Sequence, residues 1–501
     1  MKHILTKLFR SVLPLWGLGG VLLFSSCEDF LDTRPEATTD AAGMDYAKAE
    51  NIFLPVSAAY AMMRNNNAHG FAYIGLFEIA GDDADKGSGA GDNPPMQEID
   101  NFSYSSVNDL INNIWLGCYD MVSVANHAIH EMPKFEAALL SAENRQYARE
   151  CQGEAKVLRA YAYFNLVRLF GRVYIADTIY QADELANLPQ RSAQEIYDFI
   201  EKDLQEAIAV LPQDYGKEWA GRINRYTALA LKAKVHLYQS EWDSVAACAG
   251  KVIASGRYDL MSNYRDVFRS KGENSEESLF EIQSSTLGRS VGEATYLEYA
   301  FYQGPRGNSP TNMQGWGFCV PSQPLIDFLN TRGDTKRAEV ILMKAGETYE
   351  GSPIKLVDGN PLYYNGKVFS PPSENTWTYN GYGFGYNVRV LRYADVLLMY
   401  AEALVRGGID PQSAATAAEA LNAVRDRVDL SPLAATLDNI LDERRAELAL
   451  EEDRFFDLVR SGRAPTVLGS KGFTAGKNEV YPIPSKQLQL NTKMTQNAGY
   501  N

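Results

Sequence analysis

Apolar residues recur every three or four positions along most of this chain, which is the period of an amphipathic helix. The pattern predicts helices over residues 107–132, 149–170, 192–212 and 437–461. The second of these stops at Gly171, a residue that commonly ends helices. The third opens on a serine followed three residues later by a glutamate, the signature of a capping box. The pattern therefore predicts a mainly α-helical protein.

Two further regions each contain a pair of helices joined by a short turn. The first pair is expected at residues 225–239 and 242–255, and the second at 392–405 and 413–428. Alanines recur in the first pair, which lets two helices approach closely. Helix pairs of this length are typical of tetratricopeptide repeats. Because long stretches of sequence separate the pairs, we do not expect a simple solenoid.

Two stretches have a different composition, without helical periodicity. Residues 65–106 are rich in Gly, Asp, Asn and aromatic residues, and residues 280–390 in Gly, Pro, Asn, Tyr and Trp. Only a few short strands are predicted there. Long irregular segments in a large helical protein are often functional. We therefore expect a helical scaffold, mainly residues 107–260 and 391–461, that carries two loop-rich ligand-binding portions.

The N-terminus reads as a lipoprotein export signal. Basic residues precede an apolar run over residues 12–24, and Ser25 and Ser26 lie directly before Cys27. In bacterial lipoproteins the signal is removed before such a cysteine, which is then acylated and holds the protein on a membrane. The apolar run is short for a membrane span. The alternative is an ordinary signal peptide in which Cys27 is incidental.

The charge of the chain limits its partners. The formal net charge is −15. Removal of residues 1–26 takes away three positive charges and no negative ones, which leaves −18. A chain this acidic is repelled by nucleic acid and by anionic surfaces. Neutral molecules or another protein are the expected partners.

The remaining cysteines show no metal-binding or redox spacing. Their even number allows disulfides in an exported protein, but their apolar neighbours favour buried free thiols. The four residues are Cys118, Cys151, Cys248 and Cys319.

Several segments, in order along almost the whole chain, resemble the SusD/RagB family of outer-membrane nutrient-binding lipoproteins. The segments that carry the resemblance are Cys27-Glu-Asp-Phe-Leu-Asp32, Glu154-Ala-Lys-Val-Leu-Arg-Ala-Tyr161, Leu169-Phe-Gly171, Gly221-Arg222, Leu391-Arg-Tyr-Ala-Asp-Val-Leu-Leu-Met-Tyr-Ala-Glu-Ala403, Glu443-Arg-Arg-Ala-Glu-Leu448, Tyr481-Pro-Ile-Pro484 and Gln496-Asn-Ala-Gly-Tyr500. The resemblance implies a signal peptide over residues 1–26 and one SusD-like domain over residues 27–501. It also implies capture of oligosaccharides at the cell surface and their delivery to a TonB-dependent transporter, the SusC-like partner.

A saccharide site needs aromatic rings for stacking and polar side chains for hydroxyl groups. Trp316 is the strongest candidate, because glycines flank it and polar residues precede it. For any single one of the other rings, pinning of its loop is the favoured role, and packing is favoured for Tyr382, Phe384 and Tyr386. The full set of candidate ligand-binding residues is Trp316, Tyr302, Tyr296, Asn312, Gln314, Arg306, Trp377, Tyr73, Asp83 and Phe102.

Acidic residues 82, 83 and 85 form a small cluster. Asp82, Asp83 and Asp85 offer the oxygen ligands that calcium prefers. No EF-hand spacing follows them, so a solvated acidic loop is the favoured interpretation.

Sequence motifs of catalysis are lacking. No zinc-protease, serine-hydrolase or nucleotide-binding motif occurs. Glu443, Glu447 and Glu451 lie at four-residue intervals, and arginines interleave with them, which indicates structural ion pairs rather than a glycosidase pair. We therefore expect a binding protein that has no catalytic residue, metal or cofactor. The alternative is a lipid-anchored helical scaffold that binds only protein or peptide.

Overall fold

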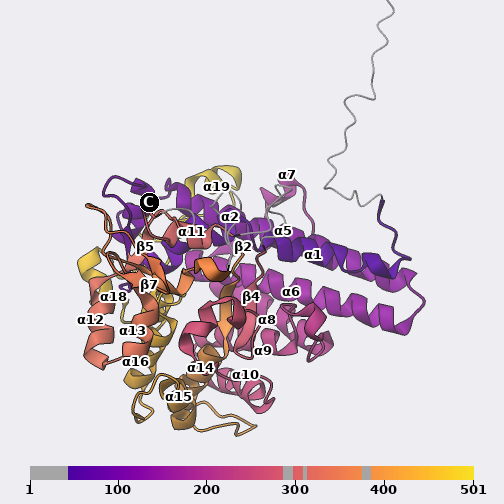
Figure 1. Ribbon diagram of the computed structural model, residues 1–501. Helices are drawn as coiled ribbons and strands as arrows, with labels where there is room; N and C mark the ends of the chain where they lie inside the picture. Colours follow the sequence, from indigo (N-terminus) through magenta and orange to yellow (C-terminus); the bar gives the residue numbers. More distant parts are fainter. Residues whose placement is uncertain (1–42, 286–296, 309–312, 375–384, 501) are drawn as a thin grey trace, which may run out of the picture. The chain divides into compact units, whose positions relative to one another are not determined.

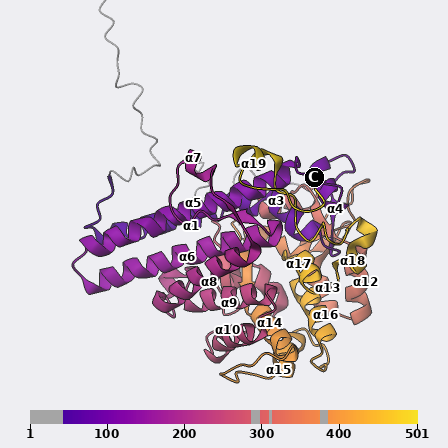
Figure 2. The same ribbon diagram turned by 180° about the vertical axis from the view of Figure 1, so that it is seen from behind.

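The first two long helices, α5 (Asp109–Ala138) and α6 (Ala142–Phe170), pack side by side as an antiparallel pair (Figures 1 and 2). The structure is a computed structural model that describes residues 43–285, 297–308, 313–374 and 385–500. Helix α5 continues through Pro133, beyond the predicted end at residue 132. A proline has no N–H for the carbonyl four residues earlier. The amide of Gln152 on α6 donates to that carbonyl, Ile129 O, at 3.2 Å, which satisfies it.

Helices from both halves of the sequence form one continuous stack. Helix α6 packs on α8 (Ala193–Val210), α8 on α9 (Arg225–Tyr238), and α9 on α10 (Trp242–Ala254). Helix α10 then contacts α14 (Tyr393–Val405), which packs on α15 (Ala417–Asp426) (Figure 1). The two predicted helix pairs are thus neighbours in space although they are far apart in sequence. The mainly helical, tetratricopeptide-type prediction is confirmed.

The starts of these helices follow from local capping. The Ser192 hydroxyl accepts from the backbone N–H of Glu195, and the Glu195 carboxylate accepts from the Ser192 N–H at 2.8 Å. Thr416 and Glu419 form the same reciprocal pair at the start of α15. Each capping box satisfies backbone donors that the first helical turn leaves free. The α15 start at Ala417 lies four residues later than the predicted 413.

The remaining α-helices have 12 residues or fewer. They are α1 (Leu54–Met62), α2 (Asn66–His69), α3 (Phe71–Tyr73), α4 (Pro94–Asp100), α7 (Ala182–Leu185), α11 (Tyr299–Gln303), α12 (Gln323–Arg332), α13 (Thr335–Ile341), α16 (Leu437–Leu448), α17 (Arg454–Arg460), α18 (Ala464–Leu468) and α19 (Ser485–Leu490).

Within the described residues the strands form five two-stranded antiparallel sheets. These are β1 (Ala84–Gly87) with β5 (Phe318–Pro321), β2 (Val173–Tyr174) with β3 (Gln190–Arg191), β4 (Ser278–Ile282) with β10 (Val388–Arg392), β6 (Leu342–Lys344) with β9 (Tyr363–Asn365), and β7 (Thr348–Tyr349) with β8 (Ser352–Pro353). Most of these short strands lie in the segments without helical periodicity. The β1–β5 pair matters most for function, because it joins the two loop-rich portions of the sequence.

The prediction of one long helix over residues 437–461 is wrong. Helix α16 ends at Leu448 and α17 begins at Arg454. Between them, Leu450 and Glu452 have positive φ angles of 61° and 64°, which an α-helix does not contain. The turn lets the Glu452 N–H donate to the Glu78 carboxylate at 2.6 Å. Tertiary partners of the acidic residues therefore override the local helical pattern.

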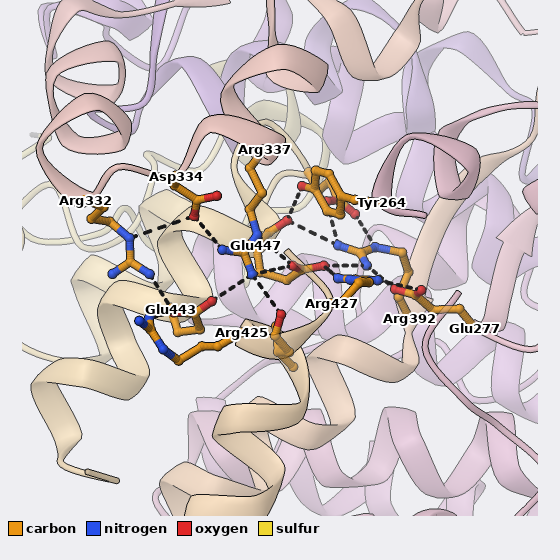
Figure 3. A network of polar contacts seen from close by, with 12 residues as sticks. Tyr264, Glu277, Arg332, Asp334, Arg337, Arg392, Arg425, Arg427, Glu443 and Glu447 are labelled. Atoms are coloured by element: carbon orange, nitrogen blue, oxygen red, sulfur yellow. Dashed lines mark hydrogen bonds and ion pairs between the residues drawn. The ribbon is translucent and has the colours of Figure 1, made fainter. Parts of the chain in front are cut away.

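A buried network of ion pairs surrounds α16 (Figure 3). The Glu447 carboxylate pairs with Arg337 and Arg392, each at 2.9 Å, and with Arg427. Burial alone would raise the pKa of Glu447, but the three guanidinium groups hold it well below its usual range. One turn earlier, Glu443 pairs with Arg337 at 2.7 Å and with two further arginines. The prediction that these glutamates form structural ion pairs is confirmed.

All four described cysteines are buried and free. Burial raises the pKa of the Cys118 thiol to about 12, so it stays protonated and unreactive. The favoured prediction of buried thiols is confirmed. None of the helices in the described residues combines the length and apolar character needed to cross a bilayer.

We expect Glu447→Gln to lower the free energy of unfolding by about 3–5 kcal/mol, because it leaves three buried guanidinium groups without their shared counter-charge. Urea unfolding of the purified protein measures this. The control is Glu347→Gln, which removes the partner of Lys344 in an exposed pair and is expected to change stability little. Equal effects of the two substitutions would contradict the assignment of Glu447 as the centre of the network.

Candidate functional site

Trp316 lies on a loop whose backbone is fastened to helix α11. The N–H groups of Gly315, Trp316 and Gly317 donate to the carbonyls of Pro305, Phe301 and Gly304 at 2.9, 3.0 and 2.9 Å. Only glycine fits at position 315, because a Cβ there would lie 2.4 Å from the Gly304 backbone. Gly317 has a φ of +73°, which favours glycine. The flanking glycines thus hold the indole in one place.

The Trp316 side chain rests on other rings yet remains 45% exposed. Its ring centroid lies 5.2 Å from Tyr302, 5.3 Å from Phe301 and 6.1 Å from Phe71. Phe301 and Tyr302 are buried, and Phe71 is half-buried. The lower rings therefore support the indole from below and leave its outer part free for a ligand.

A group of polar side chains lies beside Gly317, the residue that follows Trp316. The Ser88 N–H donates to the Gly317 carbonyl at 2.6 Å, which brings the segment after β1 beside Trp316. Arg306 Nη1 donates to the Ser88 hydroxyl at 3.0 Å and pairs with Asp92. Arg306 and Asp92 are both partly exposed. The pair offers guanidinium donors and carboxylate acceptors close to the ring.

Hydrogen bonds hold Asp92 in its ionised form. Its carboxylate accepts from the Gly89 N–H at 2.9 Å and from the Ser88 hydroxyl at 2.8 Å. These two donors and the Arg306 guanidinium lower the pKa of Asp92 to about 2. The carboxylate is therefore a hydrogen-bond acceptor at neutral pH.

The Tyr302 hydroxyl links the ring cluster to a second polar edge. It lies 3.0 Å from Asn66 Oδ1 and hydrogen-bonds to the Glu298 carboxylate. Asn66 is exposed. The polar edge at the Tyr302 hydroxyl therefore offers an amide and a carboxylate, and half-buried Gln314 lies two residues before Trp316.

Tyr299 anchors α11 to the ionic scaffold. Its hydroxyl donates to the Glu452 carboxylate, and the backbone N–H of Glu452 donates to the Glu78 carboxylate. Burial, together with the neighbouring acids Glu451 and Asp453, raises the pKa of Glu452 to about 8. A chain of contacts thus runs from the turn after α16 through Tyr299 to the helix that supports Trp316.

The structure places the ten predicted site residues in three groups. Trp316, Arg306 and Gln314 are exposed or half-buried and lie within one stretch of the second loop-rich portion. Tyr302, Tyr73, Asp83 and Phe102 are buried, so their prediction as ligand contacts is wrong, and Tyr302 instead packs against Trp316. Tyr296, Asn312 and Trp377 lie outside the described residues, as do Tyr382, Phe384 and Cys27. Tyr386 is buried and its hydroxyl donates to Glu374, which confirms its packing role.

The favoured interpretation of residues 82–85 as a solvated acidic loop is wrong for two of the three aspartates. Asp82 pairs with Arg454 at 2.6 Å, and fully buried Asp83 pairs with Arg445 at 2.7 Å. Asp85 is exposed. The two buried carboxylates pair with arginines near the C-terminal end of the chain. The sequence around the aspartates does not indicate these distant partners.

Four polar residues of the patch were not predicted. They are Asn66, Ser88, Asp92 and Glu298. Their sequence neighbourhoods are ordinary turns or helix ends, and only the β1–β5 pairing and the Tyr302 hydroxyl bring them to the indole. Phe71, in the first loop-rich portion, supplies a third ring that packs against Trp316.

The class of protein follows from the stack: the chain is a helical-repeat protein of the tetratricopeptide type with a loop-built aromatic patch. The chain belongs to the SusD/RagB family. Residues 358–500 match the SusD family, and residues 29–237 match a family described as starch-binding and associating with the outer membrane.

Individual relatives cover most of the chain. A SusD-like protein of Bacteroides ovatus is 27% identical over 460 residues, which are 87% of this chain and 80% of the relative. The starch-binding protein SusD of Bacteroides thetaiotaomicron is 25% identical over 417 residues, which are 70% of this chain and 72% of SusD. The solved structure of a laminarin-binding SusD-like protein has a TM-score of 0.77 and 28% identity, and it covers 90% of this chain and 99% of its own.

The raised pKa of Glu452 gives a testable pH dependence. Below its usual pKa of 4.5, both the folded and the unfolded chain carry the proton. Between 4.5 and about 8 only the unfolded chain releases it, so a rise in pH favours unfolding. We therefore expect Glu452→Gln to gain stability relative to the natural protein by at least about 1 kcal/mol between pH 5 and pH 8. Thermal or urea unfolding at several pH values measures the difference.

The neighbouring Glu451→Gln is the matched control with the opposite sign. Burial alone would raise the pKa of Glu451, but Arg392 and Lys367 hold it below its usual value. Its stabilising effect is present above the unfolded pKa and is lost as the pH falls. This variant should therefore be the less stable protein at pH 8, with a deficit that shrinks in acid. A pH-independent difference for Glu452→Gln would contradict the assignment.

Proposed function

We propose that this protein captures a neutral glycan at the cell surface and passes it to a TonB-dependent outer-membrane transporter. The observation that carries the proposal is the half-exposed Trp316 indole, on a backbone fixed by hydrogen bonds and with the Arg306–Asp92 pair on neighbouring segments. A sugar ring has an apolar C–H face that stacks on an indole and a rim of hydroxyls that amides, carboxylates and guanidinium groups bind. The starch and laminarin in the names of two relatives are both neutral glucans.

Neutral ligands fit the charges of the patch. Arg306, the cation beside Trp316, is neutralised by Asp92. The whole chain is strongly acidic, which disfavours anionic polysaccharides at a distance. Linear glucan oligosaccharides are therefore the class of ligand that we assign.

The mechanism is reversible binding without a chemical step. A glycosidase needs one carboxylic acid that can donate a proton. Asp92 is held ionised by its hydrogen bonds and by Arg306, so it is an acceptor and not an acid catalyst. The glutamates of α16 are committed to arginines. We therefore assign no catalytic residue.

The proposal also includes the lipid anchor. Cys27 follows a basic and apolar signal sequence, and the family that matches residues 29–237 is described as associating with the outer membrane. Acylation of Cys27 would hold the protein on that membrane, with the patch open to the exterior. The helical stack then remains as the surface for the transporter.

A protein-only scaffold is the competing function, and it has its own support. Repeats of the tetratricopeptide type expose extended surfaces that commonly bind other chains. In that case Trp316 would serve only to fill the loop. Its 45% exposure, on top of its packing against Phe301 and Tyr302, favours the glycan.

Trp316→Ala should weaken the binding of linear glucan oligosaccharides at least about tenfold, which corresponds to ~1.4 kcal/mol, because the stacking surface is lost. Calorimetric titration of the purified protein measures this. Trp219→Ala is the matched control: that tryptophan is 43% exposed, packs on Phe53, and lies on a different segment. The control should bind like the natural protein.

Two results would contradict this placement. If both variants bind as the natural protein does, capture remains but the site is elsewhere. If the natural protein binds no glycan in a broad panel while it still binds the transporter, the scaffold function holds instead.

Cys27→Ser should release the protein from the membrane, because serine offers no thiol for acylation. Fractionation of cells that express the variant measures this, and the control is Cys118→Ser, whose thiol is buried in the fold. A Cys27→Ser protein that stays in the membrane fraction would overturn the anchor.

A further inference from the structure

Three side chains from three elements converge near the turn between α9 and α10. Glu201 comes from α8, His236 lies two residues before the end of α9, and Glu241 directly precedes α10. His236 Nδ1 lies 2.5 Å from Glu241 Oε2 and 3.7 Å from Glu201 Oε1. One ligand atom from each residue lies within 4.8 Å of the others. His236 is buried, with 4% of the residue's surface exposed.

The charges of this cluster are not balanced by the protein. In the part of the chain that the structure describes, the only basic group within ion-pair distance of either carboxylate is the one imidazole. Elsewhere in the same protein, the buried carboxylate of Glu447 has three guanidinium partners. Two carboxylates that share a single histidine therefore leave a local excess of negative charge.

A glutamine holds one of the carboxylates in position. The Gln239 amide donates to Glu201 Oε1 at 2.7 Å, and Gln194 in turn donates to Gln239 at 3.4 Å. Hydrogen bonds of this kind around a carboxylate are typical of the residues that orient metal ligands.

We propose that Glu201, His236 and Glu241 bind a divalent transition-metal ion, with Zn²⁺ as the best fit. Zinc accepts imidazole nitrogen and carboxylate oxygen in a tetrahedron with bonds of about 2.0–2.1 Å, so its ligand atoms lie roughly 3.3 Å apart. The Glu201 oxygen, 3.7 Å from the imidazole, is near that spacing. The Glu241 oxygen lies only 2.5 Å from the imidazole, but this side chain is 43% exposed and can move outward to the spacing that zinc needs. A water molecule would take the fourth position.

The donor set discriminates among metals. Calcium and magnesium prefer shells made of oxygen alone, and calcium takes six to eight ligands. A nitrogen with two carboxylates and an open side suits zinc or a similar first-row ion. Bound metal would tie α8 to the α9–α10 turn and so stabilise the helical stack.

Isothermal titration with ZnCl₂ after dialysis against a chelator tests the site on the purified protein. We expect saturation at one equivalent, no comparable heat from MgCl₂ or CaCl₂, and a higher melting temperature with zinc. Co²⁺ should give the visible absorption of a tetrahedral site. Glu241→Gln, a substitution at a partly exposed position that preserves the fold, should weaken zinc binding at least tenfold, and His236→Gln should do the same.

His127→Gln is the matched control. His127 and His130 are exposed on one face of α5 and represent surface histidines that bind zinc non-specifically. This variant should keep the one-equivalent binding and the rise in melting temperature. The proposal is overturned if the natural protein shows no zinc-dependent stabilisation, or if Glu241→Gln binds as tightly as the natural protein. It is also overturned if His127→Gln is the variant that loses binding.

Discussion

The shared carboxylate of Glu447 is the interaction on which the arrangement of this protein depends. A single buried charge holds Arg337, Arg392 and Arg427, which come from α13, the end of β10 and the residue after α15 (Figure 3). A buried charge is tolerated only when its partners are in place, so displacement of any one of these elements would remove a counter-charge from the network. The network therefore specifies how distant segments meet, more than it adds net stability.

Side chains of helix α16, which carries Glu447, contact three different parts of the protein. Glu443 and Glu447 face the arginines of the network, Arg444 pairs with Asp395 on α14 at 2.6 Å, and Arg445 reaches Asp83. Past its end, Glu452 receives the Tyr299 hydroxyl, and α11 carries the rings beneath Trp316. The rigid indole platform is in this way an extension of the ionic core. A loop-built site gains from such support, because a pre-positioned ring loses little entropy when a ligand stacks on it.

Local patterns in the sequence predicted the helices well, and long-range partners explain the errors. The capping box at Ser192 and the stop at Gly171 are local, and the structure has both. The break at residues 449–453 is not local, because Glu78 and the basic partners of Glu451 lie far away in sequence. The wrong prediction of Asp83 as a ligand contact also comes from a distant partner, because Arg445 is 362 positions away in the sequence.

In the candidate site, too, local sequence features were predictable and long-range contacts were not. Trp316 was recognisable because its glycines are adjacent, and those glycines hold its backbone against α11. Asp92 was not recognisable, because the pairing of β1 with β5 brings it to Arg306 and no nearby residue indicates that pairing. Periodicity, caps and flanking residues thus predict elements and single anchors, whereas the polar surroundings of a site depend on tertiary pairing.

A crystal structure of the protein with a bound linear glucan oligosaccharide tests the central claim most directly. The account predicts a sugar ring stacked on the Trp316 indole, with its hydroxyl groups within hydrogen-bond distance of the Arg306–Asp92 pair. An oligosaccharide bound elsewhere, with the Trp316 indole left uncovered, would contradict it.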